Sequence, residues 1–453
     1  MRTLTRKSIT SVAALALLSV AGTAGAAVNV QCPGDKDGDA AWNSGGEKAP
    51  GQNGAKAPDN TVCKHIIAGD SFVNMSDGNP LYTFGFGEQT GTAPADVIGA
   101  GILDAEWPGP TIELDQGDEF YLSLTNVGTV IRPDLFDPHT VHFHGFPNAA
   151  AVFDGVPEVS ISINMGATLT YYYNIVEPGT YIYHCHVEAS EHMEMGMLAN
   201  LWVRPAQNRL PDGTVFANNF VHSNPDNLGP ATRRIDDDPL VGFKYAYNDE
   251  DGSTLYDVES GIQVSSFDAN FHDASLFVQP LPFANLEANY PMINGRGYPD
   301  TLVSGPLPAP TDNTVEIAGH LPGKVTGTPG EVLNNGTPTQ TMDAVINVPQ
   351  GQKLLLRLSN VSIDRFFTLT AQGLKMKIVG TGARQMRGVN GKNLYREVAS
   401  VNFGGGETHD VIIDTSGVAL GTYFLHSTEV HQMSNLTQLD GGLMTEIVVG
   451  PPQ

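Results

Sequence analysis

The sequence contains few cysteines, few positively charged residues and only one long apolar run. Each of these shortages excludes some classes of protein. Three cysteines, Cys32, Cys63 and Cys185, occur among 453 residues, and 24 lysines and arginines face 49 aspartates and glutamates. The formal net charge of −25 argues against nucleic acid and anionic membrane surfaces as partners, because a phosphate-binding face must be basic. Apolar residues make up 41% of the chain, which is enough for packed cores and excludes disorder throughout.

The long apolar run lies at the N-terminus and has the three parts of a secretory signal. A basic segment, residues 2–7, precedes apolar residues 9–20, and Ala24-Gly25-Ala26 follows as a small-residue cleavage site. An apolar stretch of this length is too short to span a bilayer. We therefore predict a signal peptide over residues 1–26, a mature chain without a membrane span, and a periplasmic or secreted protein.

Export would place the cysteines in an oxidising compartment, where pairs form disulfides and an odd cysteine needs another explanation. Cys32 and Cys63 flank one loop-like segment and can pair, which leaves Cys185 over. Residues 33–60 are rich in glycine, aspartate, alanine and proline and lack periodicity. We predict that residues 27–70 form an N-terminal extension.

Helix signals are scarce, whereas short β-branched or alternating runs recur between glycine and proline turns from Cys63 to Pro205. Examples are FYLSLTN at residues 120–126 and TLTYYYN at residues 168–174. This pattern is typical of a β-sandwich.

An internal repeat predicts two such sandwiches. Residues 116–127 share their glutamine-glycine, leucine and asparagine-valine positions with residues 350–361, and GTY at 179–181 recurs at 421–423, leading to His184 and His426 respectively. Two matches in the same order at nearly the same offset indicate two copies of one unit. We predict an all-β chain with sandwich domains over residues 71–205 and 239–453, joined by a polar linker at 206–238.

Histidine is concentrated between residues 139 and 192 in two groups. They are His139, His142 and His144, and then His184-Cys185-His186 with His192 and Met197. Side chains two apart on a strand share a face, and side chains at odd separations face opposite ways. On strands, His142 and His144 would therefore point away from His139, and the two histidines beside Cys185 would point away from its thiol.

This parity predicts two metal sites that lie back to back. One would gather His139, Cys185, His192 and Met197; two imidazoles, a thiolate and a weak thioether are the ligands of a blue-copper electron-transfer centre. The other would gather four imidazoles, those of His142, His144, His184 and His186, which suit copper ions that activate a small oxidant.

A covalent path through the backbone of Cys185 would carry electrons from the first site to the second. Zinc competes as the ion for His142 and His144 taken alone, and Cys185 alone can be a small buried apolar residue. Zinc cannot use a redox path, so the whole set favours copper.

These motifs resemble those of the multicopper oxidases, which are built from cupredoxin domains, and of the related copper nitrite reductases. The resemblance covers most of the mature chain and is strongest from Gly117 to Pro205. It implies cupredoxin-like Greek-key sandwiches for both domains. It also implies a type-1 copper at His139, Cys185, His192 and Met197, and type-2 or type-3 copper at His142, His144, His184 and His186. The loop between Cys185 and His192 is two residues longer than is usual in the family.

Two further segments near these motifs carry weaker signals. Asp154, in FDGVP at 153–157, resembles the family's acidic residue that relays protons during oxygen reduction, although an Asp-Gly pair is also a simple turn signal. The glycine-rich segment FGGGE at 403–407 lacks the lysine and hydroxyl residue of a phosphate-binding loop.

The second copy departs from the family pattern. It has no histidine between Val361 and Thr408, and His426-Ser427-Thr428 stands in place of His184-Cys185-His186. In copper nitrite reductases a histidine on the equivalent strand completes a type-2 site across a trimer interface. The resemblance therefore implies that His426 is a further ligand and that the protein is a homotrimer; His431 has a weaker claim.

Together these features predict an exported, multicopper-oxidase-like enzyme that reduces oxygen to water. Its electron donor would be a small molecule, a metal ion or a redox protein. The alternatives are a nitrite reductase-like enzyme, which the missing histidines of the second copy favour, and a non-catalytic copper or electron-transfer protein. His142, where nitrite reductases usually carry aspartate, and His186 favour the oxidase.

An acidic cluster flanks the predicted type-1 ligands. Its members are Asp134, Asp137, Glu188, Glu191 and Glu194. The cluster is either a solvated surface or a docking patch for a basic redox protein or a metal-ion substrate.

Overall fold

The computed structural model describes residues 28–43, 46–223, 244–312 and 330–452. The predicted signal peptide, residues 1–26, lies outside this part, as does the predicted boundary at residues 238 and 239. In the described ranges, no helix is long and apolar enough to cross a membrane. The α-helices there are short: α2 (Val97–Ala100), α3 (Ala189–Glu194) and α4 (Ala269–Leu276).

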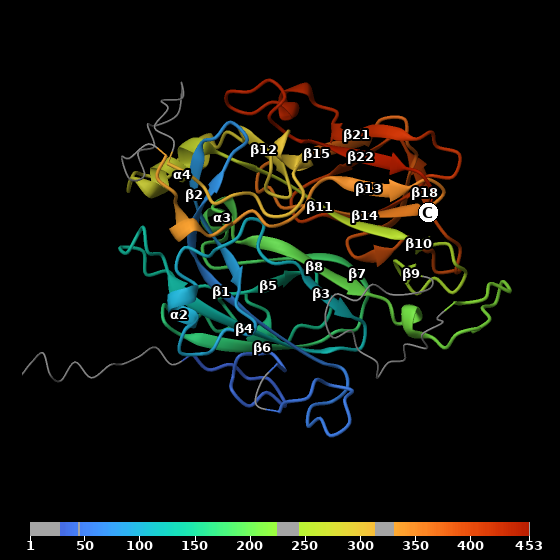
Figure 1. The fold of residues 1–453 in the computed structure, drawn as a ribbon, viewed down its shortest axis with the longest axis horizontal. Helices are drawn as coiled ribbons and strands as arrows, with labels where there is room; N and C mark the ends of the chain where they lie inside the picture. Colours follow the sequence, from blue (N-terminus) through green and yellow to red (C-terminus); the bar gives the residue numbers. More distant parts are fainter. Residues whose placement is uncertain (1–27, 44–45, 224–243, 313–329, 453) are drawn as a thin grey trace, which may run out of the picture.

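The first domain is a sandwich of two four-stranded sheets (Figure 1). One sheet has the order β2-β1-β4-β6, formed by Pro80–Glu88, Thr61–Asn74, Glu119–Gly128 and Thr168–Asn174. The other has the order β3-β8-β7-β5, formed by Ile112–Asp115, Leu198–Arg204, Gly179–His184 and His142–His144. Between them lies a core rich in aromatic side chains, in which Phe143 stacks on Tyr173 with ring centroids 4.1 Å apart.

The second domain repeats this arrangement strand for strand. Its larger sheet contains β12-β11-β14-β20, formed by Tyr290–Ile293, Val258–Phe267, Lys353–Asn360 and Thr408–Asp414. Beyond β20 the sheet continues with β16 (Met376–Thr381) and β17 (Arg384–Gln385). Strand β18 (Arg396–Val398) also pairs with β16. Its other sheet has the order β13-β22-β21-β15-β19, formed by Ile346–Pro349, Met444–Gly450, Gly421–Ser427, Phe367–Ala371 and Ser400–Phe403. A small ribbon, β9 (Lys244–Tyr245) with β10 (Leu255–Tyr256), precedes them. The all-β class and the two tandem sandwiches are confirmed.

The first sandwich begins earlier than its predicted start at residue 71. Strand β1 starts at Thr61 and pairs in parallel with β4 from there, so the last ten residues of the predicted extension belong to the sheet. Polar residues interrupt the apolar pattern of this strand, but they are buried with partners. His65 Nε2 lies 2.7 Å from Thr125 Oγ1, and Asp70 accepts hydrogen bonds from Tyr82 and from the backbone of Val130.

A disulfide ties the N-terminal segment to this strand. Cys32 and Cys63 are bonded, and Cys185 is the free, buried cysteine of the described chain. The pairing that the sequence allowed is therefore formed, and Cys185 keeps its thiol.

The two domains pack through a buried charged layer between β7 of the first domain and β14 and β20 of the second. Arg357, which is 0% exposed, donates from Nε to Glu259 at 2.5 Å, and Arg204 of the first domain donates to the same carboxylate at 2.8 Å. Thr180 Oγ1 donates to Asp410 at 2.6 Å. Each charge here has partners from both domains, which fixes how the second domain lies against β7.

Candidate metal centres

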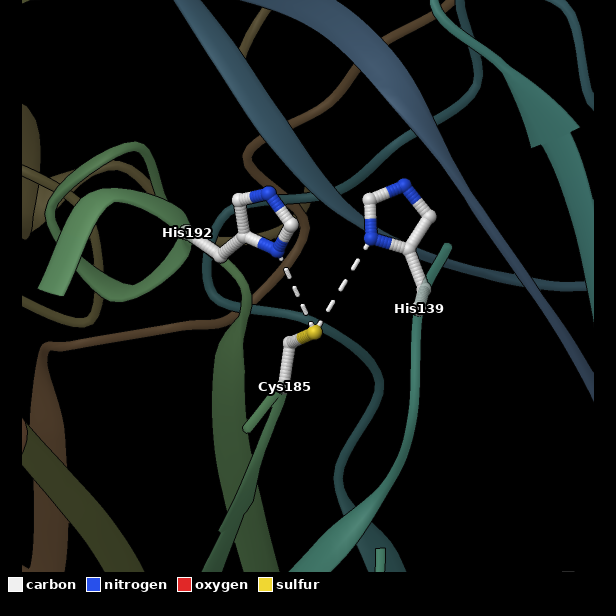
Figure 2. Close-up of side chains that lie close together, drawn as sticks. All are labelled: His139, Cys185 and His192. Carbon is white, nitrogen blue, oxygen red and sulfur yellow. Dashed lines mark hydrogen bonds between the residues drawn. The ribbon is translucent and has the colours of Figure 1, made fainter. Parts of the chain in front are cut away.

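A thiol and two imidazoles converge at the end of β7. Cys185 follows the last residue of β7, His192 lies on α3, and His139 forms a bridge with Ile163 just before β5. Cys185 Sγ lies 3.3 Å from His192 Nδ1 and 3.8 Å from His139 Nδ1. Figure 2 shows that both rings turn this nitrogen toward the sulfur. The three side chains thus present one soft and two imidazole donors to a common point.

This cluster is closed to solvent, and backbone bonds hold the loop that forms it. His139 is 2% exposed, and Cys185, His192 and Met197 are 0% exposed. The Cys185 amide donates to the Met197 carbonyl at 3.1 Å, and the Met197 amide donates to the His192 carbonyl at 2.8 Å. The main chain therefore holds the backbone of Met197, the predicted axial residue, next to Cys185 and His192.

The electrostatics of the cluster favour a thiolate. Burial raises the pKa of Cys185, but the His192 and His139 rings outweigh it, so the pKa lies well below its ordinary value. Burial lowers the pKa of His192, but the Cys185 thiolate and the Asp137 carboxylate raise it to about 10. The cluster therefore favours the thiolate form of Cys185, which is the form that binds a soft metal ion.

Four further imidazoles gather on the opposite side of the Cys185 backbone. His142 of β5 is paired with His184 of β7 in the sheet, and their ring centroids are 5.2 Å apart. His186 lies 5.2 Å from His142 and 5.7 Å from His184, again between centroids. His144 Nδ1 lies 3.3 Å from His184 Nε2. Donor nitrogens of His142, His144 and His184 all lie within 4.8 Å of one another, close enough to share an ion.

Backbone carbonyls hold two of these rings in a metal-binding tautomer. The Nδ1–H of His142 donates to the Asp154 carbonyl at 2.6 Å, and that of His184 donates to the Cys185 carbonyl at 2.9 Å. In each ring Nε2 is then the unprotonated nitrogen, the one that can bind a metal; that of His184 faces His144 Nδ1. Burial lowers the pKa of His184 to about 3, with smaller contributions from the neighbouring histidines, and burial lowers the pKa of His144. Neutral imidazoles are the form that binds copper.

Asp154 contacts this site through its main chain. Its carbonyl orients His142, and its carboxylate Oδ1 lies 3.5 Å from the same Nδ1. The next residue must be glycine, since a Cβ on Gly155, which has φ of +78°, would lie 2.1 Å from the Val141 carbonyl oxygen. The Asp154-Gly155 pair therefore forms a turn and also orients the His142 ring through the Asp154 carbonyl.

The second domain closes one side of the four-histidine site. A cavity of about 360 Å³ is lined by His142, His144, His184, His186, Met193 and, from the second domain, Val361, Ser362, Ile363, Gly405 and Gly406. A Cβ on Gly406 would lie 2.9 Å from His144 Nε2. The glycine-rich segment 403–407 is thus a wall of this cavity, a role the sequence pattern did not reveal. His144 nevertheless remains exposed, so another side of the site is open.

His426 lies apart from this cavity in the described chain. It is paired in β21 with Thr370 and Met444, as His184 is paired with His142 and Leu198. The segment Thr370-Ala371-Gln372-Gly373 therefore stands where the first domain has His142-Phe143-His144-Gly145. The second copy has lost the paired histidines and retains one ring at the equivalent position. His431 is a surface residue whose side chain is 73% exposed.

Comparisons with known proteins converge on one group. Two family models, each described as multicopper oxidase, match residues 90–208 and 309–449. Laccase abr2 of Aspergillus fumigatus is 26% identical over 325 residues, which cover 69% of this chain and 50% of the laccase. Multicopper oxidase MmcO of Mycobacterium tuberculosis is 38% identical over 80 residues, 18% of this chain and 14% of that protein. The chain thus matches half or less of the length of these relatives.

Two solved structures share the fold over most of both chains. The blue copper oxidase from Nitrosomonas europaea has 19% sequence identity and a TM-score of 0.55, and the match covers 86% of each chain. The copper nitrite reductase from Nitrosomonas europaea has 13% identity and a TM-score of 0.50 over 86% of this chain and 94% of the reductase. At these identities the likeness describes the fold.

Proposed function

This chain belongs to the multicopper oxidase family, and on that premise we propose that it is an exported copper oxidase that takes up single electrons at the Cys185 cluster and reduces oxygen to water at the four-histidine site. The observation that carries the proposal is the placement of the His184-Cys185-His186 segment. Its thiol faces His139 and His192, while its flanking imidazoles face the other way.

The residues fit copper in both clusters. A thiolate with two imidazoles supports the Cu(I)/Cu(II) couple, and neutral imidazoles suit copper that binds and activates oxygen. His139, Cys185, His192 and Met197 would hold a type-1 ion. His142, His144, His184 and His186 would hold type-2 or type-3 copper. Copper supplies one-electron chemistry when it is bound, and the three-residue segment supplies the covalent path between the sites.

The chain's own groups prepare the second site for oxygen. The carbonyls of Asp154 and Cys185 orient the His142 and His184 rings so that Nε2 is the nitrogen that would bind an ion. Reduction of oxygen to two waters consumes four electrons and four protons. The Asp154 carboxylate, 3.5 Å from the His142 ring, is placed to deliver protons there.

A homotrimer would complete this site. His426 holds its Nδ1–H against the Ser427 carbonyl at 2.7 Å, which leaves Nε2 free, and among the described residues it does not line the four-histidine cavity. The open side at His144 is where His426 of the partner subunit would be received. The N-terminal signal-like segment and the Cys32–Cys63 disulfide support a periplasmic or secreted location.

Nitrite reduction is the second candidate, because the replacement of both second-domain histidines leaves too few imidazoles for a full trinuclear cluster. One electron and two protons convert nitrite to nitric oxide and water, for which one type-2 copper is sufficient.

Copper content and turnover together test these proposals. Elemental analysis gives copper per chain, and electron paramagnetic resonance separates type-1 from type-2 signals. Oxygen uptake and nitrite loss are then compared with hydroquinone as donor. Two classes of copper with oxygen uptake support the oxidase, whereas nitrite loss alone supports the reductase. One type-1 copper without turnover would reject both and leave an electron-transfer protein.

A further inference from the structure

The connection between β11 and β12 is much longer than its counterpart in the first domain. Strands β1 and β2, which pair in the same way, are joined by five residues, 75–79, whereas 22 residues, 268–289, join β11 to β12. This longer connection contains α4, whose Phe271 is 0% exposed and belongs to the core of the first domain. Three partly buried leucines of the connection pack against the same core: Leu276, Leu281 and Leu286. The second domain thus inserts this segment into the first.

Helix α4 lies against β2 of the first domain (Figure 1) and bonds to the end of α3. Asp268, its N-cap residue, donates its amide to Glu194 Oε1 at 2.8 Å. His272 is 0% exposed and lies between two carbonyl oxygens, with Nδ1 2.6 Å from that of Tyr82 and Nε2 3.1 Å from that of Glu194. Carbonyls only accept hydrogen bonds, so the ring is the donor where it bonds them, and with a proton on each nitrogen it bonds both. The ring thus connects α3 with β2.

These contacts reach both segments that carry the imidazoles of the proposed type-1 site. Glu194 is the last residue of α3, on which His192 lies. On the other segment, Arg132 precedes His139 and donates from its guanidinium to the Ser275 carbonyl in the last turn of α4. Carbonyls at the C-terminal end of a helix lack partners within the helix and carry partial negative charge, which suits a guanidinium. One helix of the second domain therefore contacts both ligand-bearing segments.

The loop from α3 to β8 is packed closely against the same elements. The Phe84 amide of β2 donates to the Met195 carbonyl at 2.8 Å. A Cβ on Gly196, which has φ of +116°, would lie 2.7 Å from the Phe84 carbonyl oxygen and 3.6 Å from the ring of Phe267 in the second domain. The centroid of that ring lies 4.3 Å from the centroid of the His272 ring. Because packing this close leaves no room for independent movement, a shift of α4 would displace the loop.

We infer that residues 268–289 form a brace by which the second domain holds the type-1 site of the first, and that His272 is the positioning residue for the segment that carries His192. The inference rests on the proposed copper oxidase function, since it assumes that this site binds copper. Groups that orient metal ligands are typically worth 10–100-fold in metal affinity. The repeat without paired histidines would in this way remain necessary to the metal site of the other repeat.

Hydrogen exchange on the full copper-free chain tests the brace itself. His272→Phe keeps a ring against Phe267 and removes both donors, whereas His272→Gln keeps an amide donor. His222→Phe is the matched control, because His222 is also buried, at 1% exposed, with Nδ1 3.2 Å from the Tyr245 hydroxyl. Amides of residues 187–197 should exchange at least about tenfold faster in His272→Phe, since a buried acceptor loses its donor, and less so in His272→Gln. Wild-type rates in His272→Phe, or equal rates in the control, would overturn the inference.

Copper affinity tests what the brace does for the metal. Cu(II) is titrated against a chelator, and binding is followed by the visible absorption that the thiolate gives with Cu(II). The dissociation constant should rise at least about tenfold in His272→Phe and stay at the wild-type value in His222→Phe. Arg132→Met, which releases the other end of α4, should give the same rise and replaces His272→Phe if that variant does not fold.

The two measurements separate the brace from the proposed function. An unchanged dissociation constant in the brace variants would overturn the inference while the wild type still binds type-1 copper. If the wild type gives no such absorption while exchange in residues 187–197 depends on His272, the copper oxidase function is rejected and the brace stands as a support of the thiol and its imidazoles.

Discussion

His184 and His426 hold their rings in the same way, each with Nδ1–H on the carbonyl of the residue that follows it, at 2.9 and 2.7 Å respectively. They occupy equivalent positions on β7 and β21, near the ends of those strands. One repeat surrounds its histidine with other imidazoles, and the other repeat surrounds its histidine with Thr370 and Met444. The second repeat therefore retains the ring orientation of His184 without the neighbouring imidazoles.

Replacing His426 tests whether it serves the site of a partner subunit. His426→Ala should lower the copper bound at the four-histidine site and abolish oxygen uptake, while the type-1 signal persists. Copper content, electron paramagnetic resonance and light scattering measure these effects and the oligomeric state. The matched control is His431→Ala, because its exposed side chain should be dispensable. Full copper content in the His426 variant would return this residue to a structural role.

Cys185→Ser should remove the type-1 copper and its visible absorption with little change in the fold, since serine is nearly isosteric. The His142, His144 and His184 rings do not depend on the thiol for their positions, so the second site should keep its metal. Absorption spectra and circular dichroism give the comparison. A blue variant would show that the thiolate had been assigned to the wrong site.

Gly406→Ala should disturb the four-histidine site selectively. The added Cβ would lie 2.9 Å from His144 Nε2, and φ of +84° adds a conformational cost of about 1–2 kcal/mol. Gly417→Ala is a matched control, because φ is +77° there and no atom lies within 4 Å of the added Cβ. Both variants should lose similar stability, but only Gly406→Ala should lose type-2 or type-3 copper. Equal copper retention would contradict the cavity geometry.

His65 should make the stability of the fold depend on pH. Burial lowers its pKa to about 4 from the ordinary 6.5, so the folded state keeps it neutral. Its contribution is fully present above pH 6.5 and is lost as the pH falls toward 4, by roughly 3 kcal/mol in total. His65→Gln should therefore show a shallower fall in unfolding free energy between pH 7 and 4, measured in urea. His431→Gln, at an exposed site, should keep the wild-type slope.

Glu259→Gln should destabilise the protein strongly and weaken the domain interface. It leaves the buried guanidinium of Arg357 without its closest carboxylate and removes the charge that Arg204 of the first domain pairs with; breaking such a buried pair costs about 3–5 kcal/mol. Glu397→Gln removes one member of an exposed pair with Lys375, whose side chain is 84% exposed, and should cost about 1 kcal/mol or less. Thermal unfolding measures both. Similar shifts in Tm would mean that the buried layer contributes no more than a surface pair.

The sequence was enough to predict which side chains share a strand face. It was not enough to predict the contacts that the backbone or the other domain makes with them. Alternation alone separates Cys185 from His184, and the repeat alone locates the second sandwich. In contrast, Gly406 lies in the second domain and meets His144 across the domain interface. Asp154 supports His142 through a backbone carbonyl, which every residue possesses. The buried polar residues His65 and Asp70 hid the start of β1, since their partners lie on distant segments.

The segment His184-Cys185-His186 also limits how the protein can evolve. A shift or an insertion in these residues would displace both clusters at once, so selection cannot adjust one site here without disturbing the other. The loop from His186 to His192 carries a ligand of the thiolate cluster and lines the four-histidine cavity through Ala189 and Ser190, but it holds no ligand of the second site between its ends. Variation among related chains should therefore accumulate in that loop, where it alters access to the thiolate cluster, and be suppressed at the three-residue junction.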